Sequence, residues 1–297
     1  MKPAAFFGSL VLVIAGVATY FLVRDASIPI LQPMGPIAQA ELRVIIVTFL
    51  LAAIIVLPVF FLLFYFAWKY RAHSPQVHIH HHPNWDHDNP MAEFVWWLVP
   101  SAIIAVLAVV AWQSSHALDP YVPLPGAHTL EVQVVALDWK WLFIYPEQRI
   151  ASVNELVIPA GVPVHFLLTA DAPMNSFWIP SLGGQIMVMP GMQTQLNLLA
   201  DSPGTFDGMS GNLSGRGFSR MTFKARALTQ AQFDEWVGRV QGETSVGLDT
   251  KTFASLARPS ESNPVTYYYP VMHDLYTAIY MKYMAIPHSG GHDRMAL

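Results

Sequence analysis

The chain has 297 residues, of which 53% are hydrophobic and only 12% are charged, and its mean hydropathy is +0.37. Soluble domains carry about 25% charged residues, so this composition indicates that part of the chain is surrounded by lipid. The net charge of -4 provides no basic surplus, which argues against a nucleic-acid partner. Because the chain contains no cysteine, it cannot form a disulfide, a thiolate metal site or a cysteine-linked lipid anchor.

Three long uncharged runs stand near the start of the chain, at residues 6–23, 44–68 and 94–115. A membrane-spanning helix needs about 20 mostly apolar residues, so the second and third runs predict two spanning helices. The first run follows Lys2 and fits a secretory signal as well as a retained helix. We therefore expect two or three membrane helices.

The charges after the second run indicate how the chain crosses the membrane. Lys69 and Arg71 directly follow this run. Basic residues favour the cytoplasmic side, so we expect the loop 69–91 to lie inside and the chain after His116 to lie outside.

The outer part of the chain begins with a pattern that is typical of strands. Short runs of β-branched and aromatic residues alternate with Pro, Gly, Asn and Asp, and about six to eight such strands suit a Greek-key sandwich. The predicted strands are 130–136, 139–145, 155–158, 164–169, 193–198 and 221–224, and the glycine-rich stretch 208–217 is predicted as a turn. Thr229 and Gln232 form a capping box that predicts a helix, and the ranges 249–257 and 274–285 predict two shorter helices.

Six short strings occur in order along the chain: FAWKYR at 66–71, NW at 84–85, EFVW at 93–96, DWKWLFIYPE at 138–147, MNSFW at 174–178 and PGTFDG at 203–208. In these strings and in the order of its elements, the sequence resembles subunit II of the heme-copper respiratory oxidases, most closely the bo-type quinol oxidase branch. The resemblance implies a cupredoxin-like β-sandwich held outside the membrane by a helical hairpin. The expected parts are a signal or signal-anchor segment (1–41), the hairpin (42–118), the sandwich (119–226) and a helical appendix with a tail (227–297).

In the cytochrome c oxidase branch of this family, the sandwich holds a two-copper centre through one histidine and a loop of pattern Cys-x-Glu-x-Cys-x-x-x-His-x-x-Met. The corresponding positions here are Asn175, Ser210, Asn212, Ser214, Phe218 and Met221. Copper in such sites is held by thiolates and imidazoles, and a lone thioether cannot replace them. The resemblance therefore predicts a sandwich without copper, in which Met221 is an ordinary core methionine.

These features lead us to expect subunit 2 of a proton-pumping ubiquinol oxidase in a bacterial inner membrane. The resemblance places the hemes and CuB in subunit I, so no cofactor and no catalytic residue is expected in this chain. Its partners would be subunit I, the other oxidase subunits, the bilayer and the quinol pool, but not cytochrome c. Two alternatives stay open, namely a cytochrome c oxidase subunit II with copper and a membrane-tethered copper-binding or assembly protein.

In the family, a glutamate at the position of Glu93 lies at the mouth of a proton path that leads into subunit I. An ionisable group at a membrane boundary costs free energy unless it faces protein or water. We expect the proton-path role for Glu93, and the alternative is a carboxylate that only favours the positive end of the helix dipole.

Four further features receive structural interpretations. Trp139 and Trp141 are alternate residues of one predicted strand, so they are expected to point the same way as core or docking aromatics. The aromatic run 267–269 is expected to be covered by the sandwich or by subunit I. The histidine run 78–82 is interpreted as a solvated loop, and the methionines of the segment 187–192 as packing residues at neighbouring helices or subunits.

Overall fold

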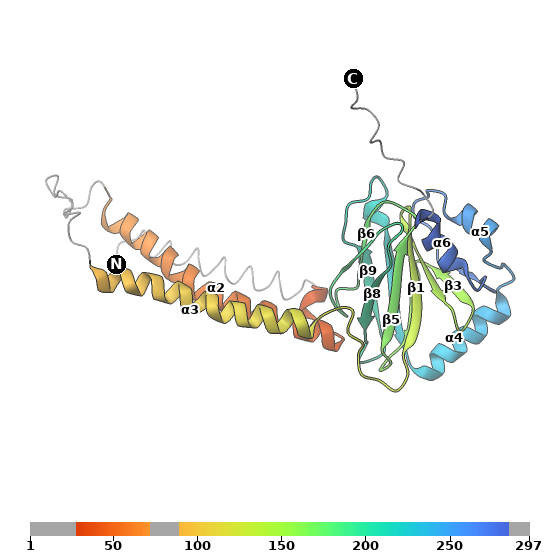
Figure 1. The fold of residues 1–297 in the computed structure, drawn as a ribbon, viewed down its shortest axis with the longest axis horizontal. Coiled ribbons are helices and arrows are strands. Elements are labelled where there is room, and N and C mark those ends of the chain that lie inside the picture. The colour runs from red at the N-terminus through yellow and green to blue at the C-terminus, as the bar shows by residue number, and fades with distance from the viewer. Residues whose placement is uncertain (1–27, 72–88, 285–297) are drawn as a thin grey trace, which may run out of the picture. The chain divides into compact units, whose positions relative to one another are not determined.

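The protein is represented by a computed structural model that describes residues 28–71 and 89–284 (Figure 1). The chain forms two compact units, one of which is Ala40–Asp119, while the other joins the chain before and after that stretch. The apolar run 6–23 and the histidine run 78–82 lie outside the described residues.

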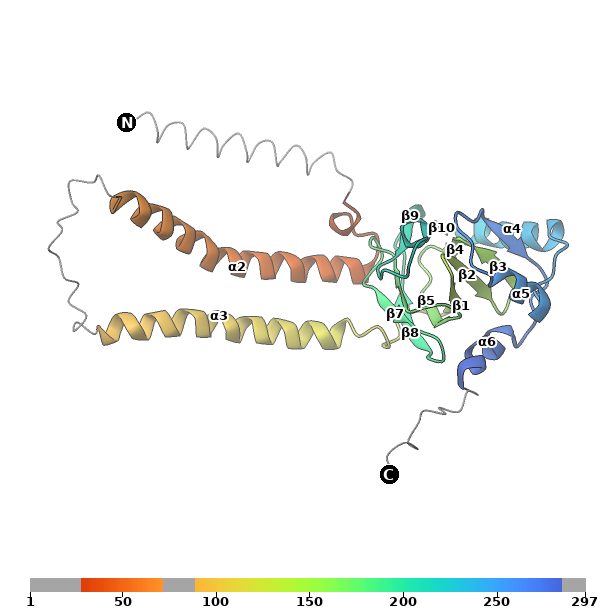
Figure 2. The same ribbon diagram turned by 90° about the horizontal axis from the view of Figure 1, so that it is seen from above.

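The first unit consists of most of α2 (Pro36–Lys69) and all of α3 (Pro90–Ala117). Both helices are long and apolar enough to cross a membrane, which confirms the two long apolar helices that the sequence predicts. At a rise of about 1.5 Å per residue, each exceeds the roughly 30 Å hydrocarbon core of a bilayer. The two helices run in opposite directions, as both views show (Figures 1 and 2).

Eleven strands among the described residues form the predicted two-sheet sandwich (Figure 2). The first sheet has the order β11-β3-β2-β1-β5-β8 and consists of β11 (Thr266–Tyr268), β3 (Ile150–Val153), β2 (Lys140–Tyr145), β1 (Leu130–Leu137), β5 (Val164–Ala170) and β8 (Thr194–Leu198). The second has the order β4-β10-β9-β6-β7 and consists of β4 (Glu155–Pro159), β10 (Thr222–Leu228), β9 (Gly204–Ser210), β6 (Asn175–Trp178) and β7 (Ile186–Val188). Neighbours are antiparallel except for the pairs β1/β5 and β4/β10, which are parallel.

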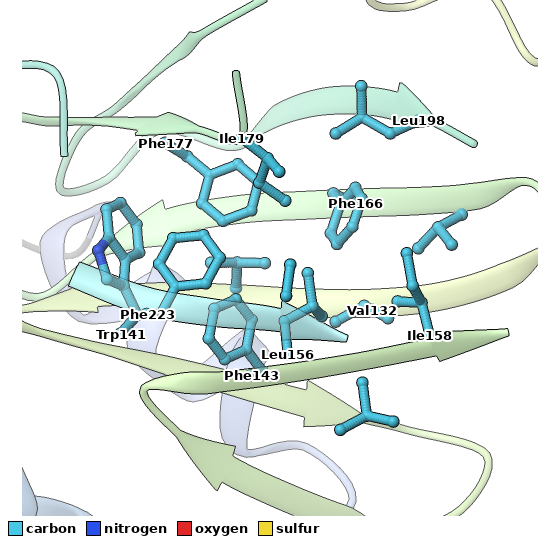
Figure 3. Packing of buried hydrophobic residues seen from close by; sticks show 14 of the residues in the cluster. Val132, Trp141, Phe143, Leu156, Ile158, Phe166, Phe177, Ile179, Leu198 and Phe223 are labelled. Carbon is cyan, nitrogen blue, oxygen red and sulfur yellow. The ribbon is translucent and has the colours of Figure 1, made fainter. Parts of the chain in front are cut away.

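The main core lies between the two sheets and is rich in aromatic rings (Figure 3). Phe177 of β6 stacks on Phe223 of β10 with ring centroids 5.2 Å apart, and Trp141 of β2 meets Phe177 edge-on at 5.4 Å. Burial of one large apolar side chain contributes about 1.5–3 kcal/mol, so this core is a main source of the stability of the sandwich.

A second apolar cluster covers the outer face of the six-stranded sheet. It joins Leu142 of that sheet to Phe253 of α5 (Thr250–Leu256) and Ile279 of α6 (Leu275–Met284). The preceding helix, α4 (Gln230–Glu243), begins at the predicted capping box and packs Trp236 into the main core. The three helices expected after residue 227 are thus confirmed.

The aromatic run 267–269 packs against the sandwich of this chain and is half-buried there, which is part of the cover that the sequence predicts. β11 pairs with β3, which adds this run to the edge of the six-stranded sheet. Tyr267 packs against the main core and Tyr268 against the second cluster.

The sequence predicts six of the strands and misses β3, β6, β7, β9 and β11. The predicted turn 208–217 begins too early, because β9 continues to Ser210 and only the residues after it leave the strand. Gly208 lies in this strand under a ring, since a Cβ there would be 2.1 Å from Cζ of Phe223. A glycine that makes room for a neighbouring ring cannot be distinguished from a turn glycine by composition.

Hydrogen bonds join the segment before α2 and the first turn of this helix to the sandwich. The N–H of Met34 donates to the carbonyl of Ser181 at 2.8 Å, and the N–H of Asp201 donates to the carbonyl of Met34 at 2.9 Å. The amide of Gln39 adds a 2.9 Å bond to the carboxylate of Asp201. Residues 34–39 therefore belong to the same compact unit as the sandwich.

Candidate functional site

The six positions that the resemblance assigns to former copper ligands lie in β6, at the end of β9 and in the segment between β9 and β10. Asn175 begins β6 and Ser210 ends the neighbouring strand β9, where Ser210 lies opposite Phe177. The loop after β9 carries Asn212 and Ser214 and ends in the short 3-10 helix η2 (Phe218–Arg220). Met221 follows directly, before β10.

Hydrogen bonds between amides, hydroxyls and carbonyls hold this region together. The hydroxyl of Ser210 donates to the side-chain oxygen of Asn175 at 3.0 Å, and both residues are buried. The amide of Asn175 donates to the carbonyl of Pro173 at 2.7 Å. The amide of Asn212 donates to the carbonyl of Met174 at 2.9 Å, which attaches the loop to the start of β6.

These donors do not fit a two-copper centre. Neutral amide and hydroxyl groups stand where thiolates and an imidazole would be needed. In the described part of the chain, no group of three or more His, Cys, Asp or Glu side chains is placed to hold a metal ion. Met221 is fully buried in the main core, as expected for a core methionine.

The expectation that Trp139 and Trp141 are alternate residues of one strand is wrong. β2 begins at Lys140, and Trp139 precedes it in a turn with φ of 61°. A left-handed residue breaks the alternation of a strand, so the rule that alternate residues share a face does not apply to this pair. Trp141 is fully buried in the core, whereas Trp139 is half-buried and lies against the loop after β9.

Trp139 fits closely over the end of this loop. Its indole N–H donates to the carbonyl of Ser214 at 3.1 Å. A Cβ on Gly217 would lie 2.4 Å from Cδ2 of Trp139, so only glycine fits beneath the ring. The sequence reasoning missed this contact, although the glycines at 211, 215 and 217 were a signal that a bulky group lies close to the backbone.

Comparisons with known proteins identify the family. The model "Cytochrome C oxidase subunit II, periplasmic domain" matches residues 145–228, and "COX Aromatic Rich Motif" matches residues 244–285. The chain is 45% identical to cytochrome bo(3) ubiquinol oxidase subunit 2 of Pseudomonas aeruginosa, with 90% of this chain and 80% of that protein covered. It is 44% identical to ubiquinol oxidase subunit 2 of Acetobacter aceti, with 91% and 87% covered. The chain belongs to the quinol oxidase subunit 2 family.

A more distant member, quinol oxidase subunit 2 of Bacillus cereus, is 38% identical, with 82% of this chain and 83% of that protein covered. Among solved structures, the periplasmic domain of subunit II of cytochrome oxidase from Bradyrhizobium japonicum is 24% identical, with a TM-score of 0.37. That match covers 39% of this chain and 94% of the other.

In this quinol oxidase subunit, a buried carboxylate attaches the aromatic-rich motif to the sandwich. Glu155 of β4 accepts a hydrogen bond from the hydroxyl of Tyr267 and pairs with Arg226 of β10 at 3.3 Å. Burial raises the pKa of Tyr267 to about 12, and the bond to Glu155 adds to this shift. The phenol therefore stays protonated and keeps its bond to the carboxylate throughout the physiological pH range.

Lys140, which follows Trp139 in the sequence, attaches the aromatic-rich motif to the sandwich at a second point. It is buried, and its ammonium group donates to the carbonyl of Arg258 at 2.9 Å and to the hydroxyl of Ser260. Burial lowers the pKa of Lys140, and nearby Asp138 opposes this effect. A lysine inside an otherwise apolar strand was the sequence signal for such a buried contact.

Glu93 lies in the first turn of α3 and belongs to the helical unit. The side chain of Asn89 caps this helix by accepting from the N–H groups of Met91 and Ala92, both at 3.2 Å. Glu93 is exposed, which places a carboxylate at the positive end of the helix.

The methionines that follow β6 are only partly covered by this chain. Met187 and Met192 expose 41% and 49% of their surface, while Met189 is half-buried. Their packing against a neighbouring subunit stays a prediction.

Proposed function

We propose that this chain is subunit 2 of a proton-pumping ubiquinol oxidase, a membrane-bound enzyme that oxidises quinol and reduces O2 to water. The observation that carries the proposal is the close relationship to ubiquinol oxidase subunits 2 over nine-tenths of the chain. The chain itself carries no redox centre in this proposal. It acts as a structural subunit that supports the catalytic one.

The chemistry of the copper-ligand positions supports quinol rather than cytochrome c as the electron donor. Ser210 and Ser214 stand at the two thiolate positions, and their hydroxyls do not ionise near neutral pH and cannot bridge two copper ions. Asn175, Asn212, Phe218 and Met221 complete the set of positions that we assign as former ligands without metal-binding capacity. Electrons would then pass from quinol to hemes and CuB in subunit I without entering this chain.

We place the chain in a bacterial inner membrane with its sandwich on the periplasmic side. Two long apolar helices and the basic residues Lys69 and Arg71 at the end of α2 support this topology. The proposed division is a signal or anchor segment (1–41), a membrane hairpin (42–118), a copperless sandwich (119–226) and an appendix with a tail (227–297).

Glu93 is the residue that we propose for proton uptake into subunit I. An exposed carboxylate beside the apolar residues of a membrane helix has few roles other than contact with water, protein or protons. At the start of α3 it would lie on the cytoplasmic side in the topology above.

Purification of the full chain from membranes in a mild detergent tests the proposal. We expect a larger heme-bearing subunit to copurify, quinol-driven O2 consumption, and no copper beyond that of the partner. Two extra copper ions per complex with reduced cytochrome c as donor would support the cytochrome c oxidase alternative. A chain that purifies alone with bound copper and without heme would support the assembly-protein alternative.

A further inference from the structure

Asp171 is a buried carboxylate that the proposed function does not use. It directly follows β5 and exposes only 4% of its side chain. The ammonium group of Lys282 donates to its Oδ1 at 2.7 Å, and the hydroxyl of Tyr283 donates to the same oxygen. A buried charge is costly unless it is paired and hydrogen-bonded, so Asp171 depends on the end of α6, more than a hundred residues further along the chain.

The two ends of α6 are held in different ways. Near its start, Leu275, Tyr276 and Ile279 are buried in the second apolar cluster. None of the residues 280–284 is buried, and Met281 exposes 51% of its surface. We call residues 280–284 the strap, because polar bonds to Asp171 rather than apolar burial fasten them to the sandwich.

The ion pair that fastens the strap lies at the surface of the molecule. Lys282 exposes 56% of its side chain, and its bond to Asp171 raises its pKa. Burial raises the pKa of Tyr283. Both donors therefore keep their protons at neutral pH, and water can replace them when the strap moves away.

The strap also contacts the turn between β7 and β8. Gly191 of this turn lies against Tyr283, since a Cβ added to Gly191 would be 3.0 Å from the Cβ of Tyr283. The strap therefore touches two connections of the sandwich, which are residues 171–174 between β5 and β6 and residues 189–193 between β7 and β8.

Hydrogen bonds continue from the first of these connections to the loop after β9. The amide of Asn175 donates to the carbonyl of Pro173, and the amide of Asn212 donates to the carbonyl of Met174. The carbonyls of the connection 171–174 are thus bonded on one side while its carboxylate is bonded to the strap on the other.

We propose that the strap opens and closes on the sandwich as one cooperative unit with the connection 171–174 and the turn 189–193. Closure pairs Asp171 with Lys282 and Tyr283, and opening hydrates Asp171 and releases all three segments together. Proteins open locally in such contiguous units, at a lower free energy than global unfolding. Every contact in this proposal lies within the chain, so it stands independently of the proposed function.

Hydrogen exchange with mass spectrometry on the full chain in detergent tests the strap. Lys282→Gln removes the ion pair without changing residues 171–193. We expect amide exchange to become about tenfold faster, by the same factor in 280–284, 171–175 and 189–193, because the bond to a charged group is lost and one opening event exposes all three. Faster exchange in 280–284 alone would show simple fraying of the helix and would overturn the proposal. Equal acceleration in β1 would show global unfolding and would also overturn it.

Matched variants separate the charge from the size of the side chain. Met281→Gln introduces the same residue one position earlier, on an exposed side chain, and should leave exchange in 171–175 unchanged. Lys282→Arg keeps the positive charge and should retain most of the protection. An effect of Met281→Gln equal to that of Lys282→Gln would contradict the role of the ion pair.

A double-mutant cycle provides the second measurement. Asp171→Asn removes the same ion pair from the other side, so adding Lys282→Gln to it should accelerate exchange in 189–193 little further. Fully additive effects of the two substitutions would show that they act independently, and the strap would then be excluded.

Discussion

The indole N–H of Trp139 donates to the carbonyl oxygen of Ser214 at 3.1 Å, between residues 75 positions apart in the sequence. Trp139 reaches this contact from a left-handed backbone conformation, which costs a bulky residue about 1–2 kcal/mol. Such a conformation persists only where surrounding contacts outweigh its cost. In a loop whose donors do not fit copper, the tryptophan is a main contact that fixes the backbone.

Trp139→Phe is predicted to loosen this loop without unfolding the sandwich. The phenyl ring can still cover Gly217, but the carbonyl of Ser214 loses its donor. A net hydrogen bond contributes about 0.5–1.5 kcal/mol, so amide exchange in residues 211–217 should become roughly twofold to tenfold faster. Hydrogen exchange with mass spectrometry on the full chain measures this, and Trp112→Phe in α3 is the control. Unchanged exchange in the loop would contradict the assigned role.

Tyr267→Phe is predicted to destabilise the attachment of the aromatic-rich motif. The substitution removes the hydroxyl that donates to Glu155, and a hydrogen bond to a charged group contributes about 1.5–3 kcal/mol. Chemical unfolding of the full chain in detergent measures the loss. Tyr280→Phe, which removes one hydroxyl from α6, is the control and should have a smaller effect.

The contribution of Tyr267 is predicted to depend on pH at the alkaline end. Its pKa in the folded protein is raised from 10.0 to about 12, so the folded state holds this proton more tightly than the unfolded state. The stabilisation is therefore fully present below pH 10 and is lost as the pH rises towards 12. The difference in unfolding free energy between the unchanged chain and Tyr267→Phe should shrink over that interval. A difference in unfolding free energy that grows above pH 10 would contradict the raised pKa of Tyr267 in the folded state.

Gly35→Ala is predicted to weaken the packing of the segment before α2 against the sandwich. A Cβ at this position would lie 2.2 Å from the carbonyl oxygen of Leu199, and this backbone atom cannot move aside easily. Gly238→Ala in α4 is a matched control, because nothing lies within 4 Å of its added Cβ. The control should stabilise the chain by up to about 1 kcal/mol through helix propensity, whereas Gly35→Ala should lower the melting temperature. Equal shifts for both variants would contradict the structural account.

Glu93→Gln is predicted to slow proton-coupled turnover of the whole oxidase severalfold while the complex stays assembled. The amide keeps the size of the side chain but cannot carry a proton. O2 consumption with quinol as donor measures turnover, and heme content per chain measures assembly. Glu243→Gln at the end of α4 is the control and should leave turnover and heme content unchanged. Unchanged turnover in Glu93→Gln would contradict the proton-uptake role and leave Glu93 only its favourable interaction with the helix dipole.

Local sequence patterns predict much of the fold because many of its elements depend on interactions between residues that are close in sequence. The capping box at Thr229, the apolar length of α2 and α3, and the alternation in strands such as β1 depend on neighbours in sequence. The strands that were missed depend on distant partners. β9 passes through Gly208 because Phe223 fills the space above it, and β11 exists because β3 offers an open edge.

For the positions that we propose as former copper ligands, the sequence likewise shows one part and the fold another. The identity of Asn175, Ser210 and Ser214 already excludes thiolate ligation, and the complete absence of cysteine extends this to the whole chain. The sequence could not show that Ser210 and Asn175 bond to each other, because their strands become neighbours only in the folded sheet.

The sequence alone therefore excludes thiolate ligation of a metal in this chain, since no fold can supply a missing thiol. Its apolar helices were determined in the same way, because length and composition decide whether a helix can cross a bilayer. Only the tertiary structure decided the contact that Trp139 makes and the donors that reach Asp171. Trp139 contacts a loop that lies 75 residues away in the sequence, and this contact does not exist in the unfolded chain.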